Sequence, residues 1–276
     1  MANFPRMQRR AFLRGGLGAS LAGLGIGVVG GGLGGSQHAL ARSARRHEPA
    51  HYGSTGRGAA QVVWSVDTDE PAVALTFDDG PHPRLTPRVL DLLADHQARA
   101  TFFLVGSAAE RHPSLVRRIL DEGHEVGNHS WSHAPMAHIG GDAARDEVLR
   151  GAAALARVTG EQIRWFRSPR GMLNGPILRA ATDVHQDVAM WSARAPKASP
   201  EPSRSQIADH LLGALQPGTI YCLHDGTSGR ETDDRLEPRR ENELSALPEF
   251  LSGAIERGFR FLTISELVEH ASPASR

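Results

Sequence analysis

The sequence predicts an α/β protein built from parallel βα units, and three observations support this class. Short apolar runs alternate with longer amphipathic stretches at least six times over about 210 residues. No G-x-G-x-x-G motif follows the first apolar run, so a dinucleotide site is unsupported. Polar residues directly follow four of the predicted strands, where catalytic groups collect in a βα barrel. These residues are Asp78, Asp79, His129, Arg167 and His224. A barrel is therefore favoured over a doubly wound sheet.

The first predicted strand covers residues 72–75 and ends in Thr76-Phe77-Asp78-Asp79, followed by the turn dipeptide Gly80-Pro81. Two adjacent carboxylates at the end of a buried strand are costly to desolvate unless a metal ion, an arginine or a shared proton balances them. The alternative is a turn in which one aspartate caps a helix and the other faces water. This stretch alone does not decide between the two interpretations.

The other helices and strands are predicted from the spacing of apolar residues and from residues that typically begin or end a helix. A helix over 86–96 has Pro87 near its start, and the helix over 142–158 has Asp142 as its expected N-cap and Gly160 as its stop. Further helices are expected at 113–122, 174–181, 205–215, 243–257 and from 265 onward. Strands are expected at 100–105, 124–128, 163–166, 184–191, 219–223 and 259–263. The charged stretch 227–242 is expected to be a solvated loop, with a substrate-covering lid as the alternative.

The N-terminus has the pattern of an export signal. Arg9 and Arg10 precede an uncharged, glycine-rich run over 15–35 and an A-x-A cleavage site ending at Ala41. The arginine pair resembles a twin-arginine signal, although Gln8 stands where Ser or Thr is usual. An uncleaved anchor is disfavoured because so many glycines make a poor spanning helix. We expect a signal peptide over 1–41, a flexible linker over 42–60 and one folded domain over 61–276, with no stable membrane insertion after cleavage.

Composition excludes several classes of protein. The formal net charge is zero, with 31 basic and 31 acidic side chains, so nothing indicates a nucleic-acid partner or an anionic membrane surface. The single cysteine, Cys222, rules out an intrachain disulfide and lies in an apolar run, where a buried thiol is expected to be inert.

A histidine pair makes a metal site the favoured interpretation of the tandem aspartates. His129 and His133 are four residues apart, so a helical turn or a tight loop can present both rings to one point. With one aspartate they form a two-histidine, one-carboxylate set with open positions, enough for a catalytic divalent ion. Trp131 between them is expected either to wall a sugar pocket or to pack in the interior.

Four motifs in this order resemble the polysaccharide deacetylase family (NodB homology, carbohydrate esterase family 4). They are TFDDG at 76–80, HSWSH at 129–133, RSPRG at 167–171 and Leu223-His224. The resemblance covers about residues 72–270, and it implies a distorted, incomplete (β/α) barrel. It also implies removal of N- or O-acetyl groups from sugars with a bound divalent metal, most often zinc, with cobalt, manganese or nickel as alternatives.

The resemblance assigns a role to each matching residue. Asp78 matches the general base, Arg167 the cation that orients it, and His224 the general acid. Asp79, His129 and His133 match the metal ligands. Arg170 matches the residue whose backbone N–H holds the oxyanion, and Trp131 and Leu223 are expected near the substrate. These roles fit the chemistry, because an amide cannot expel a bare amine anion and needs an acid to protonate the leaving nitrogen.

The chain departs from the family after Trp191. The family usually has an Asp-Trp pair there, and its aspartate supports the general-acid histidine. Lys197 and Ala198 are the best-matching positions here, and a lysine beside His224 would disfavour its protonated form. Asp225 or Asp187 are the candidates to replace the missing carboxylate.

Three functions remain at this stage. The first is a monomeric, exported hydrolase that deacetylates a polysaccharide such as peptidoglycan or a chitin-like oligomer. The second is a glycan-binding protein that keeps the metal site with weakened catalysis, as the missing aspartate suggests. The third is a non-haem iron oxygenase, since two histidines and a carboxylate also suit Fe(II), although the usual close H-x-D spacing is absent.

Overall fold

The computed structural model describes residues 52–53, 59–197 and 201–271, which all belong to one unit, residues 45–276. The predicted signal peptide and most of the predicted linker lie outside the described residues. Within the linker range, the two-residue strands β1 (Tyr52–Gly53) and β2 (Ala59–Ala60) pair antiparallel. No helix among the described residues is both long and apolar enough to cross a membrane.

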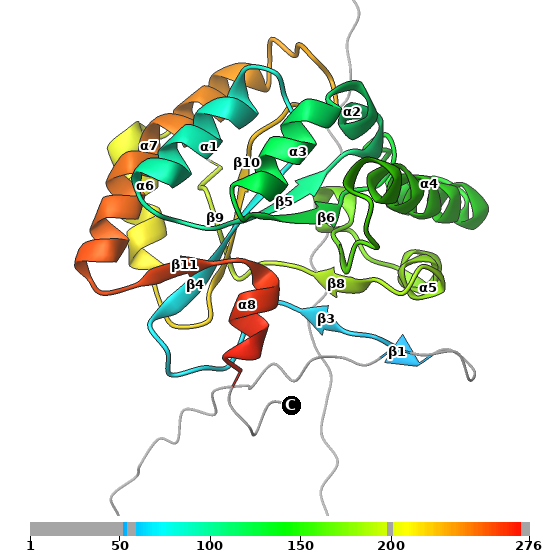
Figure 1. Cartoon of the computed structure of the whole chain (residues 1–276), viewed down its shortest axis with the longest axis horizontal. Coiled ribbons are helices and arrows are strands. Elements are labelled where there is room, and N and C mark those ends of the chain that lie inside the picture. The colour runs from blue at the N-terminus through cyan, green and yellow to red at the C-terminus, as the bar shows by residue number, and fades with distance from the viewer. Residues whose placement is uncertain (1–51, 54–58, 198–200, 272–276) are drawn as a thin grey trace, which may run out of the picture. The chain divides into compact units, whose positions relative to one another are not determined.

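A parallel sheet of nine strands forms the centre of the domain (Figure 1). Its order is β3-β8-β7-β6-β5-β4-β10-β9, with β11 pairing to β4. The strands are β3 (Val62–Val63), β4 (Ala72–Asp78), β5 (Thr101–Leu104), β6 (Glu125–Asn128), β7 (Trp165–Phe166), β8 (Asp187–Ala189), β9 (Ala193–Arg194), β10 (Ile220–His224) and β11 (Arg260–Leu262). The sheet curls into a half-barrel, and its end strands β3 and β9 do not pair with each other. The predicted incomplete barrel is confirmed.

Strand β4 is the centre of this sheet. All seven of its residues are buried, as expected for a parallel strand covered on both faces. Strand β10 pairs along one side of β4, from Ala74 to Asp78. On the other side, β11 pairs with residues 72–74 and β5 with residues 76–78. Asp78 therefore ends a strand that is held by three neighbours, which fixes the position of its side chain.

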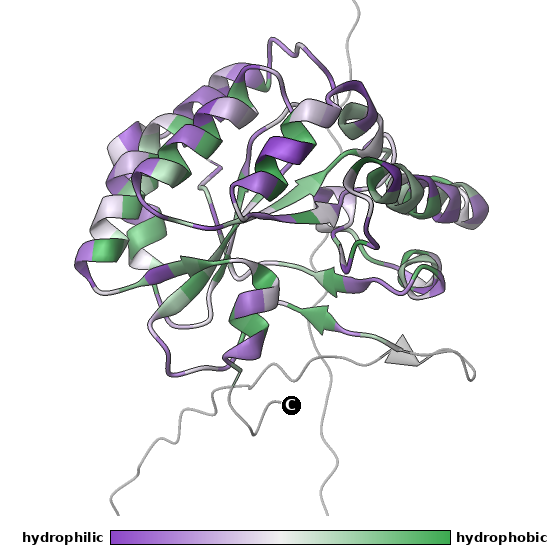
Figure 2. Cartoon of the chain, in the orientation of Figure 1, coloured by the Kyte–Doolittle hydropathy of each residue, from purple (hydrophilic) through white to green (hydrophobic). Residues whose placement is uncertain are grey.

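Helices follow most of the strands and cover the sheet. They are α1 (Leu85–Asp95), α2 (Gly106–Arg111), α3 (Pro113–Asp121), α4 (Gly141–Thr159), α5 (Gly175–Asp183), α6 (Arg204–Gly213), α7 (Glu237–Glu256) and α8 (Ile264–Glu269). Figure 2 shows hydrophobic strands between helices whose surfaces mix hydrophobic and hydrophilic residues, the pattern of a sheet core with amphipathic cover. Thirty-one buried residues form the largest hydrophobic cluster, and β4, β5, β10 and the helices over them contribute most of these residues.

The structure corrects several sequence predictions. Helix α4 is N-capped by Gly140 without a side-chain bond, so Asp142 lies in the first turn and is not the cap. Its predicted stop is confirmed, because Gly160 has the left-handed conformation (φ 80°). The short helix α2 and the two-residue strands β3 and β9 were not predicted.

The largest correction concerns the charged stretch 227–242. Helix α7 begins at Glu237, six residues before the predicted start at residue 243, with Pro238 in its first turn. The last third of the predicted loop is therefore helical, and helix α7 brings Arg240 and Glu243 to the sheet edge described next.

Candidate active site

The carboxyl ends of four strands bring the predicted site residues together. Asp78 is the last residue of β4, and His224 is the last residue of β10 directly beside it in register. His129 follows β6, and Arg167 follows β7. Parallel strands place these four side chains at one edge of the sheet because all their carboxyl ends point the same way.

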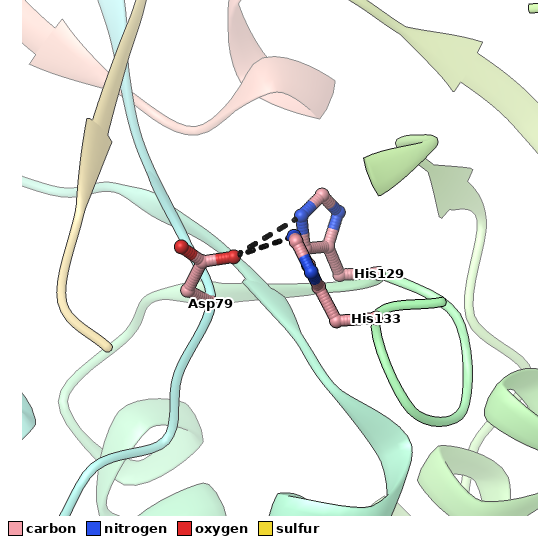
Figure 3. Close-up of side chains that lie close together, drawn as sticks. All are labelled: Asp79, His129 and His133. Atoms are coloured by element: carbon pink, nitrogen blue, oxygen red, sulfur yellow. Dashed lines mark ion pairs between the residues drawn. The ribbon is translucent and has the colours of Figure 1, made fainter. Parts of the chain in front are cut away.

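Asp79, His129 and His133 point toward one another (Figure 3). The Oδ1 atom of Asp79 lies 3.0 Å from Nε2 of His133 and 3.6 Å from Nε2 of His129. Donor atoms around a tetrahedral zinc ion lie about 3.3–3.6 Å apart, which follows from ligand distances of about 2.0–2.2 Å. The three donors therefore have the spacing and chemistry of a divalent metal site with an open side.

The hydrogen bonding of His129 supports this assignment. Its Nδ1 lies 2.8 Å from the carbonyl oxygen of Arg167, which only accepts, so Nδ1 carries the proton. The buried Nε2 then faces the Asp79 carboxylate with a lone pair, and only a second proton or a metal ion relieves that contact. Burial disfavours the charged ring, yet Asp78 and Asp79 raise the pKa of His129 above its ordinary value. Such a site favours a cation between these groups.

A tight loop presents His133. Ser130 and His133 have positive φ angles of 66° and 58°, and Ser130 Oγ accepts a hydrogen bond from the His133 backbone N–H. Glu147 of α4 accepts bonds from the backbone N–H and the hydroxyl of Ser132. The loop is thus fastened to α4, which is the tight-loop alternative predicted for the histidine pair.

Asp78 is held ionised by Arg167. The guanidinium Nη1 donates to Asp78 Oδ1 at 2.7 Å, and both side chains are buried. Burial raises the pKa of Asp78, but the charges of Arg167 and His129 outweigh it and lower that pKa below its ordinary value. Burial opposes ionisation of Asp79 too, but the His129 and His133 rings beside it hold its pKa well below the ordinary value. Both aspartates are therefore carboxylates at neutral pH.

Two site residues on α7 were not predicted. Arg240 donates through Nη2 to Asp79 Oδ2 at 2.7 Å and through Nη1 to Glu243 Oε1 at 3.3 Å. Glu243 Oε2 lies 3.0 Å from Nδ1 of His224. Both charged side chains share a buried helix face with Leu244, Leu247 and Leu251. The sequence signal for these two residues is their helical spacing: residues 240 and 243 fall on the same helix face as the three leucines.

The structure also places the residues considered as replacements for the family's aspartate. Asp225 is buried and accepts from the Thr86 hydroxyl at 2.5 Å, and Asp187 accepts from the backbone N–H of Gln61. Neither of them hydrogen-bonds His224. Lys197 is exposed and lines the same pocket as His224, and within the described part of the chain it makes no ion pair. The carboxylate beside His224 comes from Glu243.

The pocket includes most of the predicted residues but not all of them. Its lining includes Asp78, Asp79, His129, His133, Arg170 and His224. Arg170 has a left-handed backbone (φ 61°). Trp131 is not part of the lining and packs under Arg150 (4.5 Å from guanidinium to ring centre), while Trp191 lines the pocket instead. Leu223 is buried in the main core cluster.

This fold and site define the class of protein. The chain belongs to the polysaccharide deacetylase family, whose model matches residues 65–189. It is 33% identical over 210 residues to a peptidoglycan-N-acetylglucosamine deacetylase of Bacillus cereus, a match that covers 76% of this chain and 93% of the relative. It is 35% identical over 193 residues to a chitooligosaccharide deacetylase of Sinorhizobium fredii, covering 70% and 89% of the two chains. A solved peptidoglycan N-acetylglucosamine deacetylase has 30% identity and a TM-score of 0.68, covering 76% and 94%.

Proposed function

We propose that this protein is a metal-dependent deacetylase that removes acetyl groups, in the first place N-acetyl groups, from a polysaccharide outside the cytoplasm. One observation carries the proposal: the Asp79, His129 and His133 donors face one another beside Asp78, which Arg167 keeps ionised. A general base next to a divalent metal site is an arrangement that can hydrolyse an unactivated amide.

The residues divide the proton transfers between them. Asp78 accepts a proton from the water that adds to the acetyl carbonyl carbon, and Arg167 keeps Asp78 free to accept it. Asp79, His129 and His133 would hold a divalent ion, and such an ion would supply Lewis acidity for the acetyl carbonyl and the attacking water. The Arg170 backbone N–H is the proposed donor to the oxyanion.

His224, at the end of the neighbouring strand β10, is the proposed acid for the last step of the reaction. Its Nε2 donates a proton to the sugar nitrogen as the carbon–nitrogen bond breaks, which gives acetate and a free amine. His224 pairs in register with Asp78, so the proposed acid and the proposed base lie on adjacent strand ends. Two separate proton-transfer groups suit a reaction in two steps, in which water first adds to the carbonyl carbon and the amine then leaves.

Peptidoglycan and chitin-like oligomers are the proposed substrates, because relatives with both specificities match most of the chain. Export is proposed from the twin-arginine-type pattern over residues 1–41, with cleavage near Ala41 and a linker over 42–60. Zinc is the proposed native metal, since its usual ligands are imidazole and carboxylate. The proposed state is a monomer.

The test measures acetate released from N-acetylglucosamine oligomers and from peptidoglycan by the full chain. Zinc-supplemented and chelator-treated protein are compared, together with Asp78→Asn. Asp91→Asn, which alters an exposed ion pair with Arg118, is the matched control. We expect release that needs metal, survives in the control and falls at least about 100-fold in Asp78→Asn. Stoichiometric metal binding without release from any acetylated glycan would instead indicate a glycan-binding protein.

A further inference from the structure

We propose that Glu243 on α7 is the positioning residue for the general acid His224, in place of the aspartate that the family places after the strand preceding β10. This inference rests on the proposed deacetylase function and adds a residue that motif comparison does not supply. It explains how the chain can do without that aspartate.

The contact between the two side chains fixes the orientation of the histidine ring. Glu243 Oε2 lies 3.0 Å from Nδ1 of His224, and the side chains are only 9% and 16% exposed. A carboxylate can only accept, so Nδ1 is the protonated nitrogen of the neutral ring. The ring then presents Nε2 to the pocket that holds Asp78 and Asp79. When Nε2 gains its proton, the carboxylate lies against the resulting positive charge.

Arg240 holds Glu243 in this position. Its Nη1 contacts the other carboxylate oxygen, Oε1, at 3.3 Å, and its Nε donates to the backbone carbonyl of Gly226 at 2.9 Å. Its Nη2 binds the metal-site residue Asp79 at 2.7 Å. Burial alone would favour a neutral Glu243, but its contacts with His224 and Arg240 lower the pKa of this carboxyl below its ordinary value. Glu243 is therefore an ionised acceptor fixed at both oxygens.

Other ionisable groups at this end of the sheet have different contacts. Asp78 is paired with Arg167, Asp79 with Arg240 and the metal-site histidines, and Asp225 with Thr86. Arg194 and Lys197 line the pocket from β9 and the segment after it, and both are exposed. Among the described residues, Glu243 is the only carboxylate within ion-pair distance of His224.

The leaving group provides a readout that a merely structural role would not affect. An amide nitrogen must be protonated to leave, so its release depends on a correctly oriented acid. The 4-nitrophenolate ion leaves without a proton, so hydrolysis of 4-nitrophenyl acetate needs the metal site and Asp78 but not His224. Loss of the positioning carboxylate should therefore reduce amide hydrolysis far more than ester hydrolysis.

The experiment compares Glu243→Gln with His224→Ala, with their double variant and with Glu241→Gln, an exposed residue on the same helix that pairs with Arg88. Each full chain is loaded with zinc, and kcat and KM are measured on an N-acetylglucosamine oligomer and on 4-nitrophenyl acetate. For Glu243→Gln we expect the amide kcat to fall about 100-fold, with KM and ester hydrolysis changed less than about threefold. The double variant should be no slower than His224→Ala, because the two residues act as one unit. Glu241→Gln should match the wild type.

Equal losses on both substrates, or wild-type amide hydrolysis by Glu243→Gln, would overturn the inference. A second measurement is independent of activity: nitrogen-15 NMR of histidine-labelled protein reports which ring nitrogen of His224 carries the proton. We expect the Nδ1–H tautomer in the wild type and a shift toward Nε2–H in Glu243→Leu. An Nε2–H tautomer in the wild type would refute the role of Glu243 even if the deacetylase assay failed, so failures of the two proposals are distinguishable.

Discussion

Replacement of Arg167 by methionine should destabilise the protein strongly, because it leaves a buried carboxylate without its cation. The Arg167 side chain is fully buried and donates to Asp78 and Thr76 and to the backbone carbonyls of Ala189 and Met190, at 2.6–2.9 Å. Removal of one partner from a buried ion pair costs about 3–5 kcal/mol of unfolding free energy. In a domain of this size each kcal/mol lowers the melting temperature by about 2–4 °C, so a fall of roughly 6–20 °C is expected.

The assay is thermal and urea unfolding of chelator-treated protein at pH 7, since a bound metal would partly compensate Asp78. The double variant Arg167→Met with Asp78→Asn should recover part of the loss, because it removes the uncompensated charge. Arg179→Met, which breaks an exposed pair with Asp183, should change the unfolding free energy by no more than about 0.5 kcal/mol. The folded-state pKa of Asp78 is lowered in the wild type, so the stability that its pairing provides is present above pH 3.8 and is lost as the pH falls below it. A loss below about 1 kcal/mol, or a double variant no more stable than Arg167→Met, would refute this account of the pair.

Three further predictions concern other residues of the site. Burial raises the pKa of Asp225 from 3.8 to about 7, so the stability cost of ionising it is absent below pH 3.8 and grows until the pH passes about 7. The unfolding free energy of Asp225→Asn, relative to that of the wild type, should therefore rise by roughly 4 kcal/mol between pH 4 and pH 8. Urea unfolding of both proteins at each pH measures this difference, and a difference that does not change with pH would contradict the prediction. Lys197→Ala should release acetate within about twofold of the wild type, because the lysine is exposed and makes no ion pair within the described part of the chain; a tenfold change would restore a role for it. Burial raises the pKa of the Cys222 thiol well above its ordinary value, so a disulfide reagent should label it only in denaturant, and rapid labelling of the native protein would show that the residue is accessible.

Much of the site could be predicted because its residues lie at the ends of strands that can be recognised from the sequence. Residues 72–75 and 220–223 are apolar runs shortly before Asp78 and His224, and Arg167 follows Trp165-Phe166, whereas His129 follows the more polar segment 124–128. Strands β3 and β9 escaped prediction because two residues carry no period. Arg240 and Glu243 escaped for a different reason. Arg240 lies in the charged stretch 227–242 and Glu243 at the start of the predicted helix, where charged side chains indicate solvent. Their burial is explained by the three-dimensional partners Asp79 and His224.

Trp131 and Leu223 were expected near the substrate but do not line the pocket, and the backbone around each residue explains why. Alternation of side chains along a strand turns Leu223 into the core when His224, its neighbour, faces the site. Trp131 lies in the tight loop that carries the histidines, and Arg150 of α4 covers its ring. Motif position alone does not indicate which way these side chains point.

The placement of Arg240 and Glu243 on one helix has a consequence for protein engineering. Each residue of an α-helix advances about 1.5 Å and turns about 100°, so deletion of a single residue from the first turn of α7 would carry both side chains away from His224 and Asp79 together. Gly226, in the connection between β10 and α7, tolerates no side chain, since a Cβ there would lie 2.2 Å from the carbonyl oxygen of Asp79. A chimera that replaces this connection with that of a relative must therefore keep both its length and the rotational position of α7. Otherwise Glu243 will no longer contact His224, even though every recognised motif is still present.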